Sequence, residues 1–195
     1  MFRALKPMAN NRKWWYAVPF LAVLAAIFIL SSQSYGQQDI RPWLSSHAVQ
    51  EKLLRYLNGV SFTWDGREMS VTSMGAQNLA EFIIRKTAHV IVYAGLSCTL
   101  LLAFWVLFSW HKIIAIFNTV VLSLIFALFD EFNQQYSGAR TSRVSDVAID
   151  MAGVLLGILL FLAARGIYKV YRMKKERRNK RNARKARLFH DLNDT

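Results

Sequence analysis

Apolar and polar positions alternate in long blocks along the chain, and four of the apolar blocks approach the length that crosses a lipid bilayer. They cover about residues 14–31, 85–110, 112–130 and 146–168. A helix needs roughly 20 apolar residues, and about 17 as a lower limit, to span the hydrocarbon core. Backbone groups find no water partners in lipid, so these blocks must be helices. The pattern predicts an all-α, polytopic membrane protein: a bundle of four transmembrane helices with a long outer loop between the first two.

The first apolar block has two interpretations. Its basic start, and the small residues Ser32 and Ser34 that follow it, are also features of a cleaved signal peptide. However, its apolar core is longer than is usual for a signal peptide. We therefore expect this block to be kept as the first transmembrane helix.

Charge is distributed very unevenly for a chain that is 54% hydrophobic and carries a formal net charge of +13. From Arg165 onward there are twelve Lys or Arg and three Asp or Glu residues. We expect residues 1–168 to form the membrane domain and residues 169–195 a cytoplasmic polybasic tail that is attracted to anionic lipid headgroups. The basic residues lie beside an apolar block rather than on a recognition module, so we expect no nucleic-acid partner.

The charges of the short loops predict the orientation. The amino end, the tight turn containing Lys112 and the carboxyl end are all basic, and a four-span arrangement places them on the same side. Acids and bases are roughly balanced in the other two loops. Because Lys and Arg are enriched in cytoplasmic loops, both termini are predicted to be cytoplasmic.

The long loop has local signals of its own. Ser46 is typical of a helix N-cap, and Asn58-Gly59 is typical of a helix end. This helix would either lie on the membrane surface or pack over the bundle. The Asp65-Gly66 pair that follows Trp64 favours a hairpin turn.

Polar residues gather at the predicted outer ends of the transmembrane helices. Lys86, His89 and Tyr93 share one helix face, and Asp146 and Asp150 share another. A carboxylate facing lipid at the depth of Asp150 would be costly, so its side chain should face the bundle interior. The candidate site residues are Arg85, Lys86, His89, Tyr93, Asp130, Glu131, Gln134, Arg140, Ser145, Asp146 and Asp150.

Two glycines follow these acids on the last apolar block. Gly153 and Gly157 are four residues apart, which places both on one face of a helix. Small residues at this spacing allow the backbones of two membrane helices to approach closely. The motif is weak when taken alone, because glycine is common in membrane helices.

Several ordered motifs resemble the VanZ-like family over about positions 14–165. They are Ser31-Ser32-Gln33, Arg85-Lys86-Thr87-Ala88-His89 with Tyr93, Asp130-Glu131-Phe132-Asn133-Gln134, Gly138-Ala139-Arg140, and Ser145-Asp146-Val147 with Asp150 and Gly153. The resemblance implies a small multi-pass protein of the bacterial plasma membrane. The founding member of the family is associated with low-level resistance to teicoplanin-type glycopeptides. No reaction follows from the resemblance, and the loop 34–78 contains no recognised motif.

The favoured function is binding of an envelope lipid or glycolipid headgroup, or of a cell-wall precursor, at an outward-facing polar site. Arg85, Lys86 and Arg140 are suited to phosphate, because Arg can make bidentate contacts. His89, Gln134 and Asp130 are suited to orienting hydroxyl groups. Such a site should open sideways to the bilayer.

Other functions stay open. In an enzyme acting on a lipid-linked substrate, His89 and Asp146 or Asp150 would be the acid/base pair and Glu131 a proton donor. We expect no cofactor and no metal, although the same carboxylates with His89 would suit magnesium or calcium. In a purely structural protein, Lys86–Asp150 or Arg140–Asp146 ion pairs would account for the acids. Transport is disfavoured, since the sequence has no interrupted helix or internal repeat.

Overall fold

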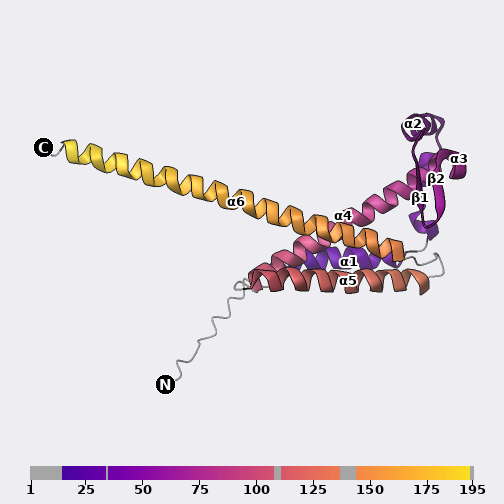
Figure 1. The fold of residues 1–195 in the computed structure, drawn as a ribbon, viewed down its shortest axis with the longest axis horizontal. Helices are drawn as coiled ribbons and strands as arrows, with labels where there is room; N and C mark the ends of the chain where they lie inside the picture. The colour runs from indigo at the N-terminus through magenta and orange to yellow at the C-terminus, as the bar shows by residue number, and fades with distance from the viewer. Residues whose placement is uncertain (1–14, 34, 108–110, 137–143, 194–195) are drawn as a thin grey trace, which may run out of the picture. The chain divides into compact units, whose positions relative to one another are not determined.

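The computed structural model describes residues 15–33, 35–107, 111–136 and 144–193, which are mostly helical (Figure 1). The elements in chain order are α1 (Val18–Ser31), η2 (Tyr35–Gln38), η3 (Arg41–Leu44), α2 (His47–Leu57), β1 (Ser61–Trp64), β2 (Arg67–Ser70), α3 (Val71–Met74), α4 (Ala76–Leu107), α5 (Lys112–Tyr136) and α6 (Val144–Asn193). The chain divides into two compact units, with the boundary between Ile158 and Leu159.

Within the described part of the chain, three helices are long and apolar enough to cross a membrane, and they belong to α4, α5 and α6. A shorter apolar helix, Trp15–Ser31, precedes them. Large apolar side chains on these helices are exposed, among them Phe28 on α1 and Phe117 on α5. A soluble protein rarely exposes apolar surface of this extent, whereas a membrane protein presents such surface to lipid. The helices therefore have the character of a membrane domain.

The long segment between α1 and α4 contains the helix and the hairpin that the sequence predicted within it, and it is largely folded. Ser46 and Asn58 flank α2 as the N-cap and C-cap residues, as the sequence indicated. The predicted hairpin is also present, with β1 and β2 antiparallel and Ser61 paired with Ser70. Asp65 and Gly66 turn the chain with φ of 49° and 71°, values typical of a two-residue hairpin loop. Short local signals, the capping residues of α2 and the turn pair of the hairpin, therefore mark these elements in the sequence.

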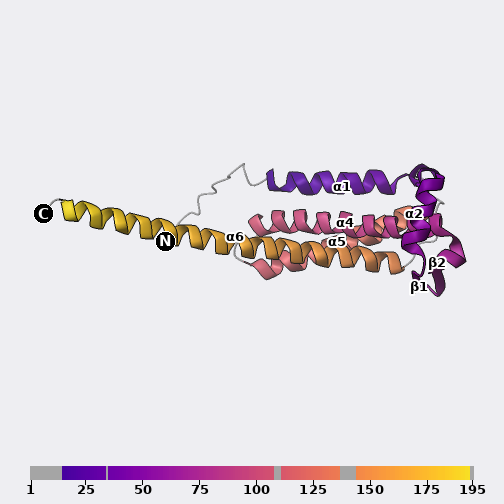
Figure 2. The ribbon, with the colours of Figure 1, turned by 90° about the horizontal axis from the view of Figure 1, so that it is seen from above.

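This folded segment packs against the beginning of α4, and we call residues 39–75 the cap. α2, α3, β2 and η3 all contact α4. Figures 1 and 2 both show the cap beside the end of α4 where that helix begins. α2 thus packs over the helices, which was one of the two arrangements expected for it. The first turns of α4, from Ala76, belong to this packing and precede the apolar block predicted to start near position 85.

Helices α4 and α6 pack closely because the two glycines of α6 face α4. A Cβ atom at Gly153 would lie 2.5 Å from the carbonyl oxygen of Val90, and one at Gly157 would overlap Ser97 Oγ and the Ala94 carbonyl oxygen. Ser97 Oγ also donates a hydrogen bond of 3.0 Å to the carbonyl oxygen of Val154. The close approach predicted from the glycine spacing is therefore observed.

The remaining contacts complete the first unit. α5 packs against α4, and α1 packs against both of them. The rings of Phe20 on α1 and Phe126 on α5 lie with their centroids 6.1 Å apart. At the end of these two helices, Asn133 donates a hydrogen bond of 3.3 Å to Ser31 Oγ. The predicted polar ends of the first and third apolar blocks therefore meet.

The second unit, residues 159–195, consists of the rest of α6, which remains helical to Asn193. Its side chains are exposed from position 163 to position 184. An ion pair of 3.1 Å between Arg172 and Glu176 lies on this exposed surface. Exposed pairs of this kind stabilise a helix only by a few tenths of a kcal/mol, about 0.3–0.5. The region predicted to be a polybasic tail is thus a charged helix.

Candidate functional site

The polar residues of α4 and α6 meet as a series of pairs in a single register. Lys86 Nζ forms an ion pair with Asp146 Oδ1, and His89 Nδ1 lies 3.0 Å from Asp150 Oδ1. Both pairs join residues 60 or 61 positions apart. Gly153 continues the same register, since a Cβ atom at this glycine would lie 3.1 Å from Tyr93 Cβ. The Lys86–Asp150 pair considered for a purely structural protein is not observed, because parallel helices in this register place Lys86 beside Asp146 and one turn away from Asp150.

Helix α5 contributes Asp130 to the same place. One ligand atom each of His89, Asp130 and Asp150 lies within 4.8 Å of the others. α5 runs antiparallel to α4, so the end of α5 reaches the level at which α4 carries its polar residues. We define the inner cluster as Lys86, His89, Asp130, Asp146 and Asp150, which come from three helices.

The inner cluster is well shielded from solvent. Asp150 is only 1% exposed and Asp130 only 6%. Asp146 is buried as well, and so is Glu131, which follows Asp130 in the chain. The His89 side chain, at 22% exposed, is more accessible than the acid it contacts. As predicted, Asp150 faces the interior of the helices rather than lipid.

Tyr93 lies one turn along α4 from His89 and is also buried. Its exposed fraction is 1%, so it is not the interfacial aromatic residue that its position alone would have allowed. Its hydroxyl has no hydrogen-bond partner among the residues that the structure describes. Asp130, Asp150 and Glu131 all lie close enough to interact electrostatically with this hydroxyl. Tyr93 therefore belongs beside the inner cluster.

The hairpin of the cap covers the inner cluster on one side. Lys86 Nζ lies 5.7 Å from the centre of the Trp64 ring and 5.5 Å from that of Phe82. These two rings pack edge to face with centroids 6.0 Å apart. Ser145 Oγ donates a hydrogen bond of 3.0 Å to Asp65 Oδ2 in the hairpin turn. Ser145, a candidate site residue, thus joins α6 to the hairpin.

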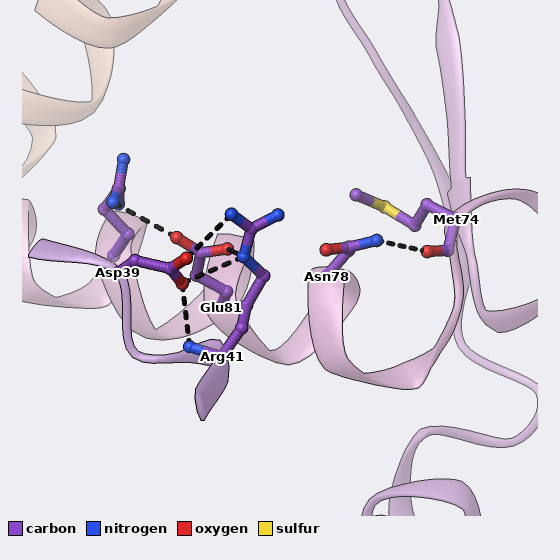
Figure 3. A network of polar contacts seen from close by, with 6 residues as sticks. Asp39, Arg41, Met74, Asn78 and Glu81 are labelled. Atoms are coloured by element: carbon purple, nitrogen blue, oxygen red, sulfur yellow. Dashed lines mark hydrogen bonds and ion pairs between the residues drawn. The ribbon is translucent and has the colours of Figure 1, made fainter. Parts of the chain in front are cut away.

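Arg85 belongs to a second set of charges, which we call the outer network: Asp39, Arg41, Glu81 and Arg85. Figure 3 labels Asp39, Arg41 and Glu81 of this network. Arg41 binds Asp39 through two side-chain contacts of 2.8 Å. Its Nε also lies 3.5 Å from Glu81 Oε2, while Arg85 Nη2 lies 3.1 Å from Glu81 Oε1. The charges alternate in sign and join the start of the cap to α4.

Asp39 shows the effect of this pairing on its acidity. The hydrogen bonds from the Arg41 side chain and backbone N–H lower the pKa of the Asp39 carboxyl from 3.8 to about 2. An opposite charge and donated hydrogen bonds both favour the ionised form of an acid. Asp39 is therefore negatively charged throughout the physiological range.

Two candidate residues have no described side-chain position. Arg140 lies outside the described residues, and Gln134 lies in α5 but its side chain is not described. Their predicted roles, including an Arg140–Asp146 pair, stay predictions.

Sequence reasoning missed the outer network and the hairpin contacts. The spacing of Glu81 and Arg85 is i, i+4, a favourable arrangement of opposite charges on a helix, and it was the one available signal. Asp39, Arg41, Trp64 and Asp65 lie in a segment whose position over α4 has no signature in the sequence. These four residues could be found only from the tertiary structure.

Comparison with protein families gives a match over most of the chain. The sequence model of the VanZ/LLP1 family matches residues 16–165, which include α1, the cap and all of the inner cluster. Comparison with curated proteins and with solved structures finds no significant match.

Proposed function

The chain belongs to the VanZ/LLP1 family and is a VanZ-like membrane protein of the cell envelope, and from this premise we propose that its inner cluster binds the headgroup of an envelope glycolipid. The observation that carries the proposal is the concentration of buried acids from α5 and α6 around His89. Ionisable residues within membrane helices are costly and usually mark a functional site. Anchoring a helix needs charges at its ends but not a buried cluster shared by three helices.

The chemistry of the cluster favours a hydroxyl-rich headgroup. Carboxylates accept hydrogen bonds from sugar hydroxyls, and His89 can donate or accept. Lys86, the cation predicted to bind phosphate, is already paired with Asp146. A phosphate at this position would have to compete with a carboxylate for Lys86. We therefore assign the sugar to the inner cluster and leave any phosphate of the same lipid to Arg140.

The proposal includes four transmembrane helices with both termini in the cytoplasm. α1 has 14 residues, about 21 Å of helix, so it needs the residues before it to reach across the bilayer. Exposed apolar residues on α1 support a lipid contact. The basic amino end and the basic second unit support the cytoplasmic position of the termini. The inner cluster and the cap then lie at the outer surface.

Cysteine labelling tests this topology. Cys98 is the only cysteine, so Cys98→Ser gives a clean background. In intact cells, a membrane-impermeant maleimide should label Arg67→Cys in the hairpin and should label Arg178→Cys only after permeabilisation. The reverse pattern would place the cap and the inner cluster on the cytoplasmic side, and labelling of both would contradict a membrane barrier between them.

Native mass spectrometry of the detergent-purified chain tests the binding. The wild type should carry a glycolipid adduct, and Asp150→Asn should lose it. Glu81→Gln is the matched control, because Glu81 is a buried acid of the outer network and should keep the adduct. A wild type that is folded and free of glycolipid when solubilised gently, or an adduct that survives in Asp150→Asn, would contradict the proposal.

A second function, catalysis, is favoured by one contact. The 3.0 Å contact between His89 Nδ1 and Asp150 Oδ1 orients the imidazole as an acid/base group would require. Such an enzyme would transfer a group to or from a lipid-linked substrate. Incubation with total envelope lipids distinguishes the two functions, since only an enzyme would deplete one lipid species with time and lose this activity in His89→Gln.

The resistance associated with the founding member of the family leads to a cellular proposal. We expect expression of this chain to raise the minimal inhibitory concentration of teicoplanin in a susceptible host, because an occupied headgroup is less accessible to the antibiotic. Asp150→Asn at equal membrane abundance should not raise it. Equal protection by both proteins would show that resistance does not depend on the inner cluster.

A further inference from the structure

We propose that His89, Asp130 and Asp150 form a binding site for a first-row divalent metal ion, Zn²⁺ or Mn²⁺. The proposal goes beyond glycolipid binding and does not depend on it, because the metal needs only these side chains and water as ligands.

The geometry of the three groups fits one ion. One imidazole nitrogen and two carboxylate oxygens lie within 4.8 Å of one another. Zn²⁺ binds such atoms at about 2.0–2.2 Å in tetrahedral geometry, so two ligands of one ion lie roughly 3.3–3.6 Å apart. The widest of the described separations therefore needs to shorten by up to roughly 1.5 Å, which changes of His and Asp side-chain rotamers can supply.

Helix packing holds these three side chains in place. His89 comes from α4, Asp130 from α5 and Asp150 from α6. Gly153 and Gly157 fix the register of α4 against α6, so His89 and Asp150 stay opposite each other. Metal sites within helical bundles are commonly built in this way, from side chains on facing helices.

The hydroxyl of Tyr93 is an independent sign of a missing ligand. It is buried, and the described residues offer it no hydrogen-bond partner. Leaving a hydroxyl unpaired in an apolar environment is unfavourable. Helical side chains tilt toward the helix N-terminus, which directs Tyr93 toward His89 one turn before it. A water molecule on the metal ion, or the ion itself, would give this hydroxyl its partner.

The donor set selects the class of ion. Imidazole suits Zn²⁺ and other first-row metals, whereas Mg²⁺ and Ca²⁺ prefer sites made of oxygen alone. Cys98, the only thiol, is not part of the cluster, so thiolate-seeking ions such as Cu⁺ are disfavoured. A doubly charged cation would also balance the two carboxylates. Of the two groups in the His89–Asp150 contact, His89 is the more exposed, at 22% of its side chain.

Metal titration of the full-length chain in detergent tests the site. The protein is purified without a histidine tag, stripped with a chelator, and titrated with ZnCl₂ or MnCl₂ alone. We expect about one ion per chain by elemental analysis after desalting, and a higher melting temperature with the ion. X-ray absorption at the metal edge should show nitrogen and oxygen ligands only.

Variants connect the ion to these residues. Asp150→Asn and His89→Gln should weaken binding roughly 100-fold, and Tyr93→Phe roughly 10-fold. Tyr93→Phe removes a single atom, so it remains informative if an aspartate variant fails to fold. His47→Gln, at an exposed histidine, and Glu81→Gln, at a buried acid elsewhere on α4, should bind as the wild type does.

Two results would overturn the proposal: a folded wild type that retains no ion from either salt, or an ion retained equally by Asp150→Asn and Tyr93→Phe. The glycolipid experiment is scored separately on the same preparations. A bound ion without a glycolipid would reject only the proposed function, and a glycolipid without an ion would reject only the metal site.

Discussion

Arg85 and Lys86 are neighbours in the chain, yet their side chains belong to two different sets of charges. Arg85 joins the outer network, in which acids and bases alternate and tie the start of the cap to α4. Lys86 joins the inner cluster, in which α5 and α6 bring their acids together around His89. The outer network resembles a set of structural ion pairs, since each described contact joins opposite charges. The inner cluster resembles a binding site, since it gathers like charges beside a buried hydroxyl without a described partner.

This difference shows that two residues adjacent in the sequence can have different partners when they lie on a helix. Successive residues of an α-helix point about 100° apart, so adjacent basic residues can face different partners. Arg85 pairs with Glu81 on its own helix and, through this acid, with Arg41 of the cap. Lys86 faces acids within the membrane domain, where an unpaired charge is expensive. Two adjacent basic residues therefore have different partners, and in the proposed function the first contributes to stability and the second to the binding site.

The largest expected effect comes from breaking the register that builds the inner cluster. Gly157→Leu places a side chain where Ser97 and Ala94 already lie, so α4 and α6 must separate. Overpacking of this kind costs about 1–3 kcal/mol and occasionally more. We expect little monodisperse protein by fluorescence-detected size-exclusion chromatography. Gly95→Leu is the control, because a Cβ atom at Gly95 meets nothing within 4 Å; equal losses in both variants would contradict the role of close packing.

Removing the polar groups of the inner cluster should abolish function without removing the protein. We expect His89→Ala and Asp146→Asn to lose the co-purified glycolipid while their membrane levels, measured by immunoblot, stay near that of the wild type. The reason is that neither change removes apolar packing between helices, and the amide oxygen left by Asp146→Asn can still accept a hydrogen bond from Lys86. If both proteins disappear from the membrane instead, the inner cluster is structural.

Breaking the outer network should have the opposite result. Glu81→Gln leaves Arg41 and Arg85 as two cations without the acid that joins them. Because Arg41 is well exposed, we expect a loss of only about 1–2 kcal/mol, below the range for a fully buried pair. The melting temperature should fall while the glycolipid adduct persists. Loss of the adduct with an unchanged melting temperature would show that the outer network takes part in binding.

The smallest effect concerns Asp39 and pH. Its pKa is lowered from 3.8 to about 2 in the folded protein by the hydrogen bonds from Arg41. A lowered pKa means that the ionised acid stabilises the fold above pH 4 and that this contribution is lost as pH falls from about 4 to 2. The melting temperature of Asp39→Asn should therefore be slightly below that of the wild type at pH 6, and the gap should close near pH 2. A gap that widens on acidification would contradict the Asp39–Arg41 contact.

Much of the local structure could be predicted because its signals lie within short segments. Apolar blocks predicted α4, α5 and α6. The capping residues Ser46 and Asn58 predicted α2, and the Asp65-Gly66 pair predicted the hairpin. The interior position of Asp150 followed from the cost of a carboxylate in lipid. Each of these inferences needs only the preferences of a few neighbouring residues.

The partners of the charged residues could not be predicted in the same way. The partner considered for Lys86 in a purely structural protein was Asp150, but Lys86 pairs with Asp146. Arg85, placed with Lys86 in one candidate site, pairs with Glu81. Pairing across helices depends on their direction, rotation and axial offset, and a shift of one turn exchanges every partner. The position of the cap over α4 depends likewise on contacts between segments far apart in the chain.

The amino-acid sequence by itself determined that this is a helical membrane protein of the VanZ-like type, which residues are polar within its helices, and that two glycines allow α6 to approach another helix. Only the tertiary structure decided that this other helix is α4 and that the polar pairs between α4 and α6 join residues 60 or 61 positions apart. It alone also brought Asp130 beside His89 and Asp150. The physical reason is that hydropathy, capping and turn preferences act over a few residues. A site shared by three helices is set instead by how their surfaces fit together.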